Sequence, residues 1–288
     1  MKTTISLLAV LSLLVWAAEA VAVERDVAPV AGAASPGRQR DRRPGPLVIV
    51  GGGGTPESVR LQFVKLAGGK QGRIAVLPQA SRREDRGVSS VKMFDALVGQ
   101  VFIVELEDLE RARKQINSAT AVWFPGGSQL ALYDALTKAG LAKLIRQRHA
   151  RGLAVGGTSA GAAVMSDVMI SSTPAKPGLR AGNTPNSRGL GLVPNLIIDQ
   201  HFVRRRRMNR LVGIVLDQPG RIGVGIGEAT AIIVSDGRFR VMGENSVIVI
   251  DPRGARIEKP ATGGLQSARG LQVHVLRAGQ EFRFKQKD

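Results

Sequence analysis

Short apolar segments alternate with segments of helical length from residue 47 onward, and this alternation constrains the fold more than any other feature. Each apolar segment is rich in Val and Ile, and a stretch long enough for a helix follows it. This order is typical of βαβ units and predicts a parallel sheet covered by helices. The strands are expected at 47–50, 73–78, 101–106, 121–124 and 153–157. The helices are expected near 57–66, 88–98, 107–116, 128–137 and 139–149, with another beginning near Ala160.

The pattern changes in the last third of the chain, where strand-like segments predominate. The segment TAIIVSDGRFRVMG (230–243) predicts a hairpin whose turn is Asp236-Gly237. The other expected elements are strands at 195–202, 221–228, 247–251 and 271–276 and a helix near 207–217. We therefore expect residues 47–288 to form one α/β domain, with a mostly parallel sheet and a C-terminal antiparallel extension.

The first 46 residues have the features of a targeting segment followed by a linker. Lys2 precedes an apolar stretch that is too short to be a comfortable membrane span, and small residues suited to signal-peptide cleavage follow it. Residues 23–46 are rich in Ala, Pro, Gly and Arg and have no apolar period, which predicts a disordered linker. We expect residues 1–22 to be a signal peptide, the mature protein to be secreted or periplasmic, and no stable membrane insertion after cleavage.

Four of the predicted parallel strands end in the glycine-rich or polar turns GGGG, PQASR, PGGSQ and GGTSAG. Ligands of such sheets bind beyond the carboxyl ends of the strands. The last turn contains a G-x-S-x-G pattern centred on Ser159, between a predicted strand and a predicted helix. Small neighbours allow the sharp, strained turn that exposes a serine nucleophile. A serine that only caps the helix N-terminus is the alternative interpretation.

The chain has no cysteine and only three histidines, so few side chains can act as nucleophile or base. His149 ends a basic helix, and His274 alternates within an apolar strand. His201 lies at the end of an apolar strand, where the site of a parallel sheet is expected. By elimination, His201 is the predicted base. Glu228, at the end of the next strand, is the predicted acid, with Asp199 as its rival.

Two turns contain candidate donors for an oxyanion. The Ala160 amide begins the helix after the serine, and Gly126 or Gly127 lies in the PGGSQ turn. Gln129, at the end of the same turn, is a candidate substrate ligand. The glycines at 51–54 lack the G-x-G-x-x-G spacing and the lysine of a phosphate-binding loop, so we expect a tight first turn of the sheet rather than a nucleotide site.

The formal net charge is +18, and the densest basic cluster is RRRR at 204–207. Basic surfaces bind nucleic acids or other anions. Aromatic residues make up only 4% of the chain, which leaves few platforms for stacking bases. Guanidinium groups bind carboxylates bidentately, and this cluster follows His201 directly. A carboxylate-rich substrate such as an aspartyl peptide is therefore expected, and a specific nucleic acid is not.

Four segments together resemble the cyanophycinases of peptidase family S51, serine peptidases related to dipeptidase E. They are GGTSAGAAV, PGGSQ, GLGLVPNLIIDQHFVRRRRMNRL and GVGIGEATAIIV, and the resemblance spans roughly residues 47–251. It implies a flavodoxin-like α/β fold, related to class I glutamine amidotransferases, with a Ser-His-Glu triad. By position, the resemblance implies Ser159 as nucleophile, His201 as base and Glu228 as acid. The family positions that line the substrate site are occupied by Gln129, Gln200, Arg205 and Arg207, and Arg210 also matches.

The activity that the resemblance implies is hydrolysis of cyanophycin, a poly-aspartate whose side-chain carboxylates carry arginine, with release of β-aspartyl-arginine dipeptides. It implies no metal or organic cofactor, and a homodimer is expected.

The chain departs from the family pattern beside the triad. Acidic residues that usually flank the triad glutamate are replaced by Gly227 and Ala229, and Val203, Arg204 and Arg206 replace an acidic pair and a glycine. In other members of the family, we expect the acidic residues that this chain lacks to contact the arginine groups of cyanophycin.

A second function class competes with the peptidase. A non-catalytic basic module that binds an anionic polymer or nucleic acid would also use the arginines at 204–207. Such a module predicts salt-sensitive binding that does not need Ser159.

Overall fold

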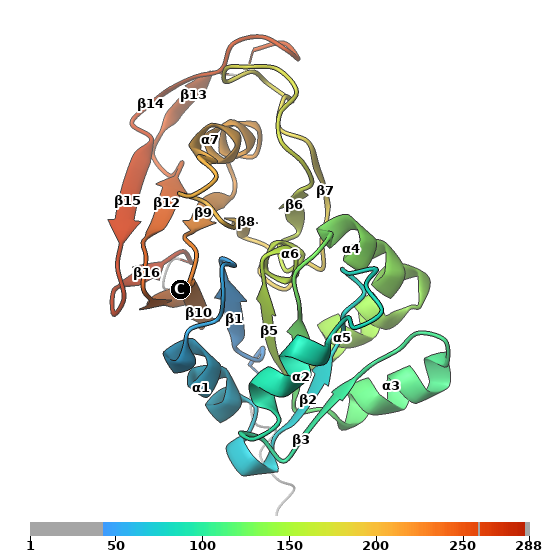
Figure 1. Cartoon of the computed structure of the whole chain (residues 1–288). Coiled ribbons are helices and arrows are strands. Elements are labelled where there is room, and N and C mark those ends of the chain that lie inside the picture. The colour runs from blue at the N-terminus through green and yellow to red at the C-terminus, as the bar shows by residue number, and fades with distance from the viewer. Residues whose placement is uncertain (1–42, 259, 286–288) are drawn as a thin grey trace, which may run out of the picture. The chain divides into compact units, whose positions relative to one another are not determined.

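The computed structural model describes residues 43–258 and 260–285 (Figure 1). Its largest sheet has eight strands in the order β16-β11-β10-β1-β5-β4-β2-β3. The five strands from β1 to β3 in that order are parallel to one another, as the alternation of strands and helices predicts. Their bounds are β1 Leu47–Val50, β5 Ala154–Thr158, β4 Ala121–Phe124, β2 Arg73–Val76 and β3 Gln100–Ile103.

Helices cover both faces of this sheet because alternate residues of its strands point to opposite sides. Val48 and Val50 of β1 pack in one core with α1 and α2, whereas Leu47 and Ile49 pack in a second core with α3, α4 and α5. The bounds of these helices are α1 Glu57–Leu66, α2 Val88–Phe94, α3 Leu109–Ser118, α4 Gln129–Lys138 and α5 Leu141–His149, and a short 3-10 helix, η1, spans Gly69–Gln71. The predicted helices therefore exist at the expected places, although α2 ends four residues earlier than expected.

An antiparallel hairpin extends the large sheet beyond β1. Strand β10 (Thr230–Ser235) pairs antiparallel with β1, and β11 (Arg238–Gly243) and β16 (Glu281–Arg283) continue that edge. The turn of the hairpin is Asp236-Gly237, and both residues have positive φ, of 49° and 72°. Such values match the two-residue turn that the Asp-Gly pair predicts.

A second sheet of four strands lies beside the large one, in the order β15-β12-β9-β8 (Figure 1). Strands β8 and β9 are parallel, and β12 and β15 continue the sheet in antiparallel order. Helix α7 (Met208–Asp217) connects β8 to β9 and packs on this sheet. The strands span Leu196–Asp199 (β8), Ile222–Ile226 (β9), Val247–Asp251 (β12) and Gln272–Leu276 (β15). The sequence pattern predicts these strands but does not show that β8 and β9 leave the main sheet, because the edge beside β1 is already occupied by β10.

The remaining elements are short. They are α6 (Ala160–Ala163), the antiparallel pair β6 (Val168–Ile170) and β7 (Asn186–Arg188), and the antiparallel pair β13 (Arg256–Glu258) and β14 (Ser267–Arg269). No helix within the described ranges is both long and apolar enough to span a bilayer.

The predicted signal peptide and most of the predicted linker lie in residues 1–42, outside the described residues. The end of the linker segment contacts the domain. The Gly45 N–H donates a hydrogen bond to the His149 carbonyl (2.8 Å), and the Pro46 carbonyl accepts one from the Val155 N–H (3.0 Å). Ordered contacts with the sheet therefore begin before residue 47.

Candidate active site

Ser159 lies at the sharp turn between β5 and α6, where the G-x-S-x-G pattern predicts it. Its φ of 54° and ψ of −112° form a strained conformation that a non-glycine residue rarely adopts. Neighbouring glycines make the turn possible, since a Cβ atom on Gly161 would lie 2.0 Å from the carbonyl oxygen of Phe124. The Ser159 side chain makes no capping hydrogen bond to α6. The alternative interpretation, a serine that serves only as a helix cap, is therefore wrong.

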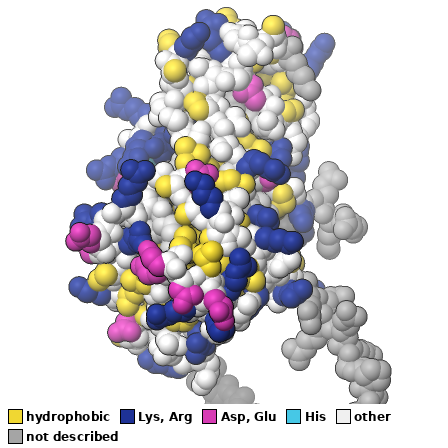
Figure 2. Space-filling view, turned by 90° about the vertical axis from the view of Figure 1, so that its right-hand side faces the viewer, with side chains coloured by type: hydrophobic (Ala, Val, Ile, Leu, Met, Phe, Trp, Pro, Cys, Tyr) yellow, Lys and Arg dark blue, Asp and Glu magenta, His cyan; other side chains and the backbone are white. Residues whose placement is uncertain are grey.

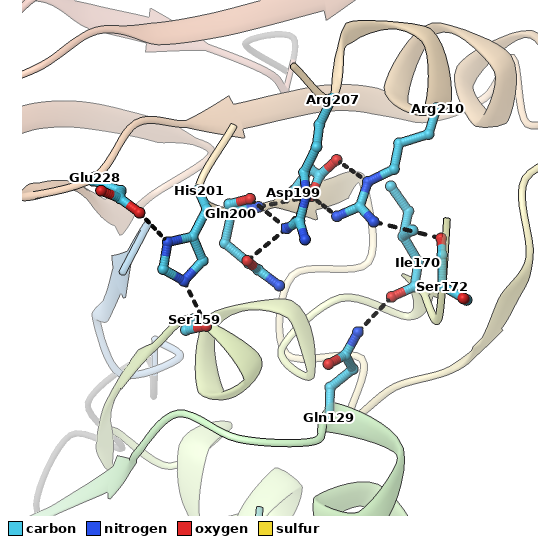
Figure 3. A network of polar contacts seen from close by, with 10 residues as sticks. All are labelled: Gln129, Ser159, Ile170, Ser172, Asp199, Gln200, His201, Arg207, Arg210 and Glu228. Atoms are coloured by element: carbon cyan, nitrogen blue, oxygen red, sulfur yellow. Dashed lines mark hydrogen bonds and ion pairs between the residues drawn. The ribbon is translucent and has the colours of Figure 1, made fainter. Parts of the chain in front are cut away.

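A chain of hydrogen bonds joins Ser159, His201 and Glu228 (Figure 3). Ser159 Oγ lies 3.0 Å from His201 Nε2, and His201 Nδ1 lies 2.5 Å from Glu228 Oε1. The imidazole and the carboxylate are largely buried, with 12% and 17% of their side-chain surfaces exposed. A carboxylate at Nδ1 favours the tautomer in which Nε2 accepts the serine proton.

The three residues come from two different sheets. Ser159 follows β5 of the large sheet, whereas His201 follows β8 of the second sheet. Glu228 lies in the three-residue connection through which the chain passes from β9 in the second sheet to β10 in the large one. The sequence pattern predicts strand ends of a single parallel sheet, and this prediction is wrong for the base and the acid. Because β8 and β9 are parallel neighbours, their carboxyl ends still meet beside β5.

The end of β1 ties the two sheets together. The Val50 carbonyl accepts a hydrogen bond from the Ser159 N–H (3.0 Å), and the Gly51 carbonyl accepts one from the His201 N–H (2.7 Å). The Gly52 carbonyl accepts a bond from the N–H of Ala229, the residue after Glu228 (2.8 Å). Three consecutive carbonyls therefore fix the backbone at or beside each member of the hydrogen-bonded chain.

The glycines at 51–54 do more than form a tight turn, and sequence analysis missed this role. A Cβ atom on Gly52 would lie 2.4 Å from Cε1 and Nε2 of His201, and one on Gly53 would lie 2.5 Å from Cβ of Glu228. Both glycines have positive φ, of 93° and 69°. The signal was present in the sequence as four consecutive glycines, because glycine suits positive φ and close approaches of the backbone to other groups.

Asp199, the rival candidate for the acid, does not contact His201. It is 1% exposed, and its carboxylate accepts hydrogen bonds from Arg210, through Nε (2.7 Å) and through NH2. Arg207 lies 3.5 Å from the same carboxylate. Asp199 therefore pairs with two arginines, and Glu228 is the carboxylate that the structure brings to the histidine.

The candidate oxyanion donors are arranged around Ser159. A Cβ atom on Gly126 would be 3.5 Å from Cβ of Ser159, so the PGGSQ turn packs against the serine. Gly127 has a φ of 142°, a value that suits glycine. No acceptor among the described residues takes the N–H of Ala160 or of Gly127. Both amides are therefore available to an oxygen of a bound substrate.

A polar network next to the serine contains most of the residues predicted to line the substrate site (Figure 3). Gln129 Nε2 donates a hydrogen bond to the Ile170 carbonyl (3.0 Å). Gln200 Oε1 accepts one from Arg207 (2.7 Å), which also donates to the Gln200 carbonyl (2.6 Å). Arg205 is exposed and does not belong to this network.

Electrostatics around Glu228 depend on Arg204, whose contact was not predicted. The Arg204 guanidinium donates to Glu228 Oε2 (2.7 Å), the oxygen that does not face His201. The Arg204 hydrogen bond, followed by that of His201, holds the pKa of the Glu228 carboxyl below its usual range. The carboxylate is therefore kept ionised by partners on both of its oxygens.

The two other histidines contact residues away from this site. His149 is 5% exposed, and its Nδ1 lies 3.2 Å from the Leu153 carbonyl. Burial lowers the pKa of His149. His274 lies on β15 with its ring 5.1 Å from that of Phe282. In the part of the chain that the structure describes, no three His, Asp or Glu side chains gather closely enough to hold a metal ion.

Comparisons with known proteins agree with this architecture. The sequence profile of Peptidase family S51 matches residues 47–242. A cyanophycinase of Trichormus variabilis is 34% identical over an alignment of 243 residues, and the match covers 78% of this chain and 80% of the relative. A cyanophycinase of Synechococcus elongatus is 32% identical over an alignment of 255 residues, and the match covers 81% of this chain and 78% of the relative. In fold, the chain is similar to a crystal structure of a peptidase from an acI-B1 Actinobacterium, with a TM-score of 0.63 and 22% sequence identity. The match covers 85% of this chain and 98% of the other. A profile match over most of the chain and relatives above 30% identity together show that the chain belongs to peptidase family S51.

Proposed function

We propose that this serine-type peptidase hydrolyses cyanophycin or related aspartyl peptides through a triad of Ser159, His201 and Glu228. The observation that carries the proposal is the hydrogen-bonded chain of these three side chains, with 3.0 Å between Ser159 Oγ and His201 Nε2. Further support comes from the curated relatives, which are cyanophycinases. As an exopeptidase on cyanophycin, the enzyme would release β-aspartyl-arginine dipeptides.

The proposed reaction begins at the strained serine. Ser159 Oγ attacks the scissile carbonyl carbon while its proton passes to His201 Nε2. The carbonyl oxygen becomes an oxyanion, which the N–H groups of Ala160 and Gly127 stabilise. Collapse of this intermediate breaks the C–N bond, and His201 gives its proton to the leaving amine. Water then attacks the acyl-enzyme, His201 takes a proton from that water and returns it to Ser159, and the free acid leaves.

The network beside the triad supports an aspartyl substrate. Its cations come from Arg207 and Arg210, and the described acidic partner of both is the single carboxylate of Asp199. Two guanidiniums and one carboxylate leave one positive charge uncompensated, which suits a substrate carboxylate. Gln200, held by Arg207, would then orient a polar group of the substrate.

Substitution of the serine tests the proposal. Purified protein is incubated with cyanophycin and with a panel of α- and β-aspartyl dipeptides, and the products are identified by mass spectrometry. We expect Ser159→Ala to lower kcat/KM by about four orders of magnitude or more, with an unchanged unfolding temperature. Ser235→Ala, at an exposed position on β10, is the matched control and should keep full activity.

Two outcomes would count against the triad. Turnover that survives in the Ser159→Ala variant would remove the serine from the mechanism. Absence of turnover by the parent protein, together with salt-sensitive polyanion binding that Ser159→Ala does not change, would favour the non-catalytic basic module.

We also propose that the protein is exported and that it forms a homodimer. Export is supported by the sequence of residues 1–22, and the dimer only by the family resemblance. Cell fractionation with N-terminal sequencing of the mature protein tests the first proposal, and light scattering of the purified protein tests the second. Export fails if the protein in the cell still begins at Met1, and the dimer fails if the scattering mass is that of one chain.

A further inference from the structure

A cavity of about 320 Å³ lies beside the network of Arg207 and Arg210, and its walls are strongly basic. It is formed by the segment between β6 and β7 on one side and by the arginine cluster and the start of α7 on the other. Six of its described lining residues are cationic, and none is Asp or Glu. The six are Lys176, Arg180, Arg205, Arg206, Arg207 and Arg210.

Most of this charge has no partner within the protein. Arg207 and Arg210 share the buried carboxylate of Asp199. The described residues provide no ion pair for Lys176, Arg205 or Arg206, and Arg180 donates to the backbone carbonyl of Gly263. Charges of one sign around a cavity repel one another and attract an anion.

The burial of Arg207 points in the same direction. Burial, and then the charge of Arg210, lower the pKa of Arg207 to about 10. Both causes disfavour the charged form of the guanidinium, and a nearby negative charge opposes them, as Asp199 does in part. An anion in the cavity would supply that charge.

Arg207 connects the cavity with the segment that carries His201. Arg207 lines the cavity and holds Gln200, the residue before His201, through two hydrogen bonds of 2.7 and 2.6 Å. Its volume is at the small end of ligand sites. Leu179 and Pro177 give part of its wall an apolar character, which suits the methylene groups of an amino-acid side chain.

We propose that this cavity is a subsite for a second carboxylate of the substrate, so that the enzyme prefers peptides with an acidic residue next to the aspartyl group. The inference rests on the proposed function because it assigns the cavity to the same peptide. Lys176, Arg180 and Arg206 are the cations assigned to this second carboxylate. Unlike Arg207 and Arg210, these three residues make no ion pair with Asp199.

Binding to the inactive Ser159→Ala protein tests this inference without turnover. The probes are α- and β-aspartyl dipeptides whose second residue is Glu, Gln or Lys, and the dissociation constants are measured by calorimetry. Glu and Gln have nearly the same shape, so their comparison isolates the charge. We expect the Glu dipeptide to bind about tenfold more tightly than the Gln dipeptide, since a charged hydrogen bond replaces a neutral one, and the Lys dipeptide to bind most weakly.

A charge-matched pair of variants then locates the effect. Lys176→Gln with Arg206→Gly removes two cations from the cavity, and glycine suits position 206 because Arg206 has a φ of 51°. Lys143→Gln with Arg146→Gln removes the same charge from exposed positions on α5. We expect the first pair to abolish the preference for Glu over Gln and the second pair to retain it.

The inference is overturned if the Glu and Gln dipeptides bind equally, or if both pairs of variants behave alike. It is also overturned if a single-stranded oligonucleotide displaces the bound Glu dipeptide at a concentration below the dissociation constant of that dipeptide. Failure of the proposed function is a different result, because the parent protein would then cleave none of the dipeptides while the Ser159→Ala protein still showed the binding preference.

Discussion

Gly52 stands so close to the triad that it controls where the imidazole can lie. A methyl group at this position would be 2.4 Å from two atoms of the His201 ring, so the ring would have to move. A catalytic group displaced by about 1 Å can cost about a hundredfold in rate. We therefore expect Gly52→Ala to lower kcat/KM by about a hundredfold or more.

Gly54 offers a matched control for this substitution. It also has a positive φ, of 107°, but a Cβ atom there would meet nothing within 4 Å. Gly54→Ala therefore carries a similar backbone strain without displacing the triad. Comparable activities in the two alanine variants, measured at equal fractions of folded protein, would show that strain and not contact with His201 is responsible.

Arg204 is the residue that most strongly keeps the Glu228 carboxylate ionised. Its hydrogen bond is the first cause of the lowered pKa of that carboxyl. A depressed carboxyl pKa means that the ionised form, which holds His201, persists to lower pH and is lost as the pH falls through the folded pKa. Removal of the guanidinium raises that pKa, so the acid limb of kcat/KM should move to higher pH in Arg204→Gln.

The pH profile separates this role from a general effect of charge. Arg204→Lys retains the positive charge and should keep the acid limb near that of the parent. Lys143→Gln removes a remote charge and should leave the limb in place. If Arg204→Gln changes the maximal rate but not the position of the acid limb, then Arg204 does not act through the ionisation of Glu228.

At the scale of the elements, a buried ion pair connects β8 to α7. Asp199 at the end of β8 is 1% exposed, and Arg210 on α7 has 7% of its side chain exposed. Loss of one partner from a buried pair leaves an uncompensated charge and typically costs about 3–5 kcal/mol. Asp199→Asn should therefore lower the free energy of unfolding by about 3–5 kcal/mol in urea denaturation.

An exposed pair provides the comparison for Asp199. Asp85 contacts Arg83 at 2.8 Å, but both side chains are more than half exposed. Asp85→Asn should leave the urea midpoint unchanged within error, because exposed pairs contribute little. A similar midpoint for Asp199→Asn and the parent protein would mean that the buried network is not needed for stability.

Elements with a local sequence signal were predictable. The Asp236-Gly237 pair specifies its own turn, and the strands β1 and β4 have the expected bounds, since four consecutive apolar residues are buried in each. The placement of β8 and β9 in a second sheet was not predictable, because it depends on β9 pairing with β12 across the β10–β11 hairpin, which itself joins the large sheet. Gly225 contributes to that packing, since a Cβ atom there would meet the Phe202 ring at 2.4 Å.

At the scale of the whole molecule, one face shows how the charged side chains are arranged (Figure 2). Lys and Arg side chains are spread over the face in Figure 2, with Asp and Glu among them mainly in its lower half. A continuous basic stripe is the usual mark of nucleic-acid binding. On this face acidic side chains lie among the basic ones, which differs from a continuous basic stripe.

The start of the described chain leads to a prediction about the whole domain. Gly45 and Pro46 hydrogen-bond to the residues before and within β5, whereas the sheet itself begins at Leu47. Deletion of residues 1–42 should leave the unfolding temperature and kcat/KM unchanged. Deletion of residues 1–46 removes both hydrogen bonds and should lower the free energy of unfolding by about 1–3 kcal/mol.

The two truncations are compared by calorimetry and by initial rates on one substrate. An inactive or unfolded product of the first deletion would show that the domain needs the segment before residue 43. Equal stability of the two truncated proteins would show that the contacts of Gly45 and Pro46 are dispensable.

Local sequence patterns were enough to predict the α/β class, the order of strands and helices, and Ser159 and His201 as members of the site. These features depend on local apolar periodicity and on turns with special residues, such as the one at Ser159. The three-dimensional structure was needed to show that Glu228 and not Asp199 contacts His201, that Gly52 and Gly53 leave room for the triad, and that Arg204 holds the free carboxylate oxygen. Those contacts join strands of two sheets that are far apart in the chain, and no local pattern specifies which side chains meet across such a junction.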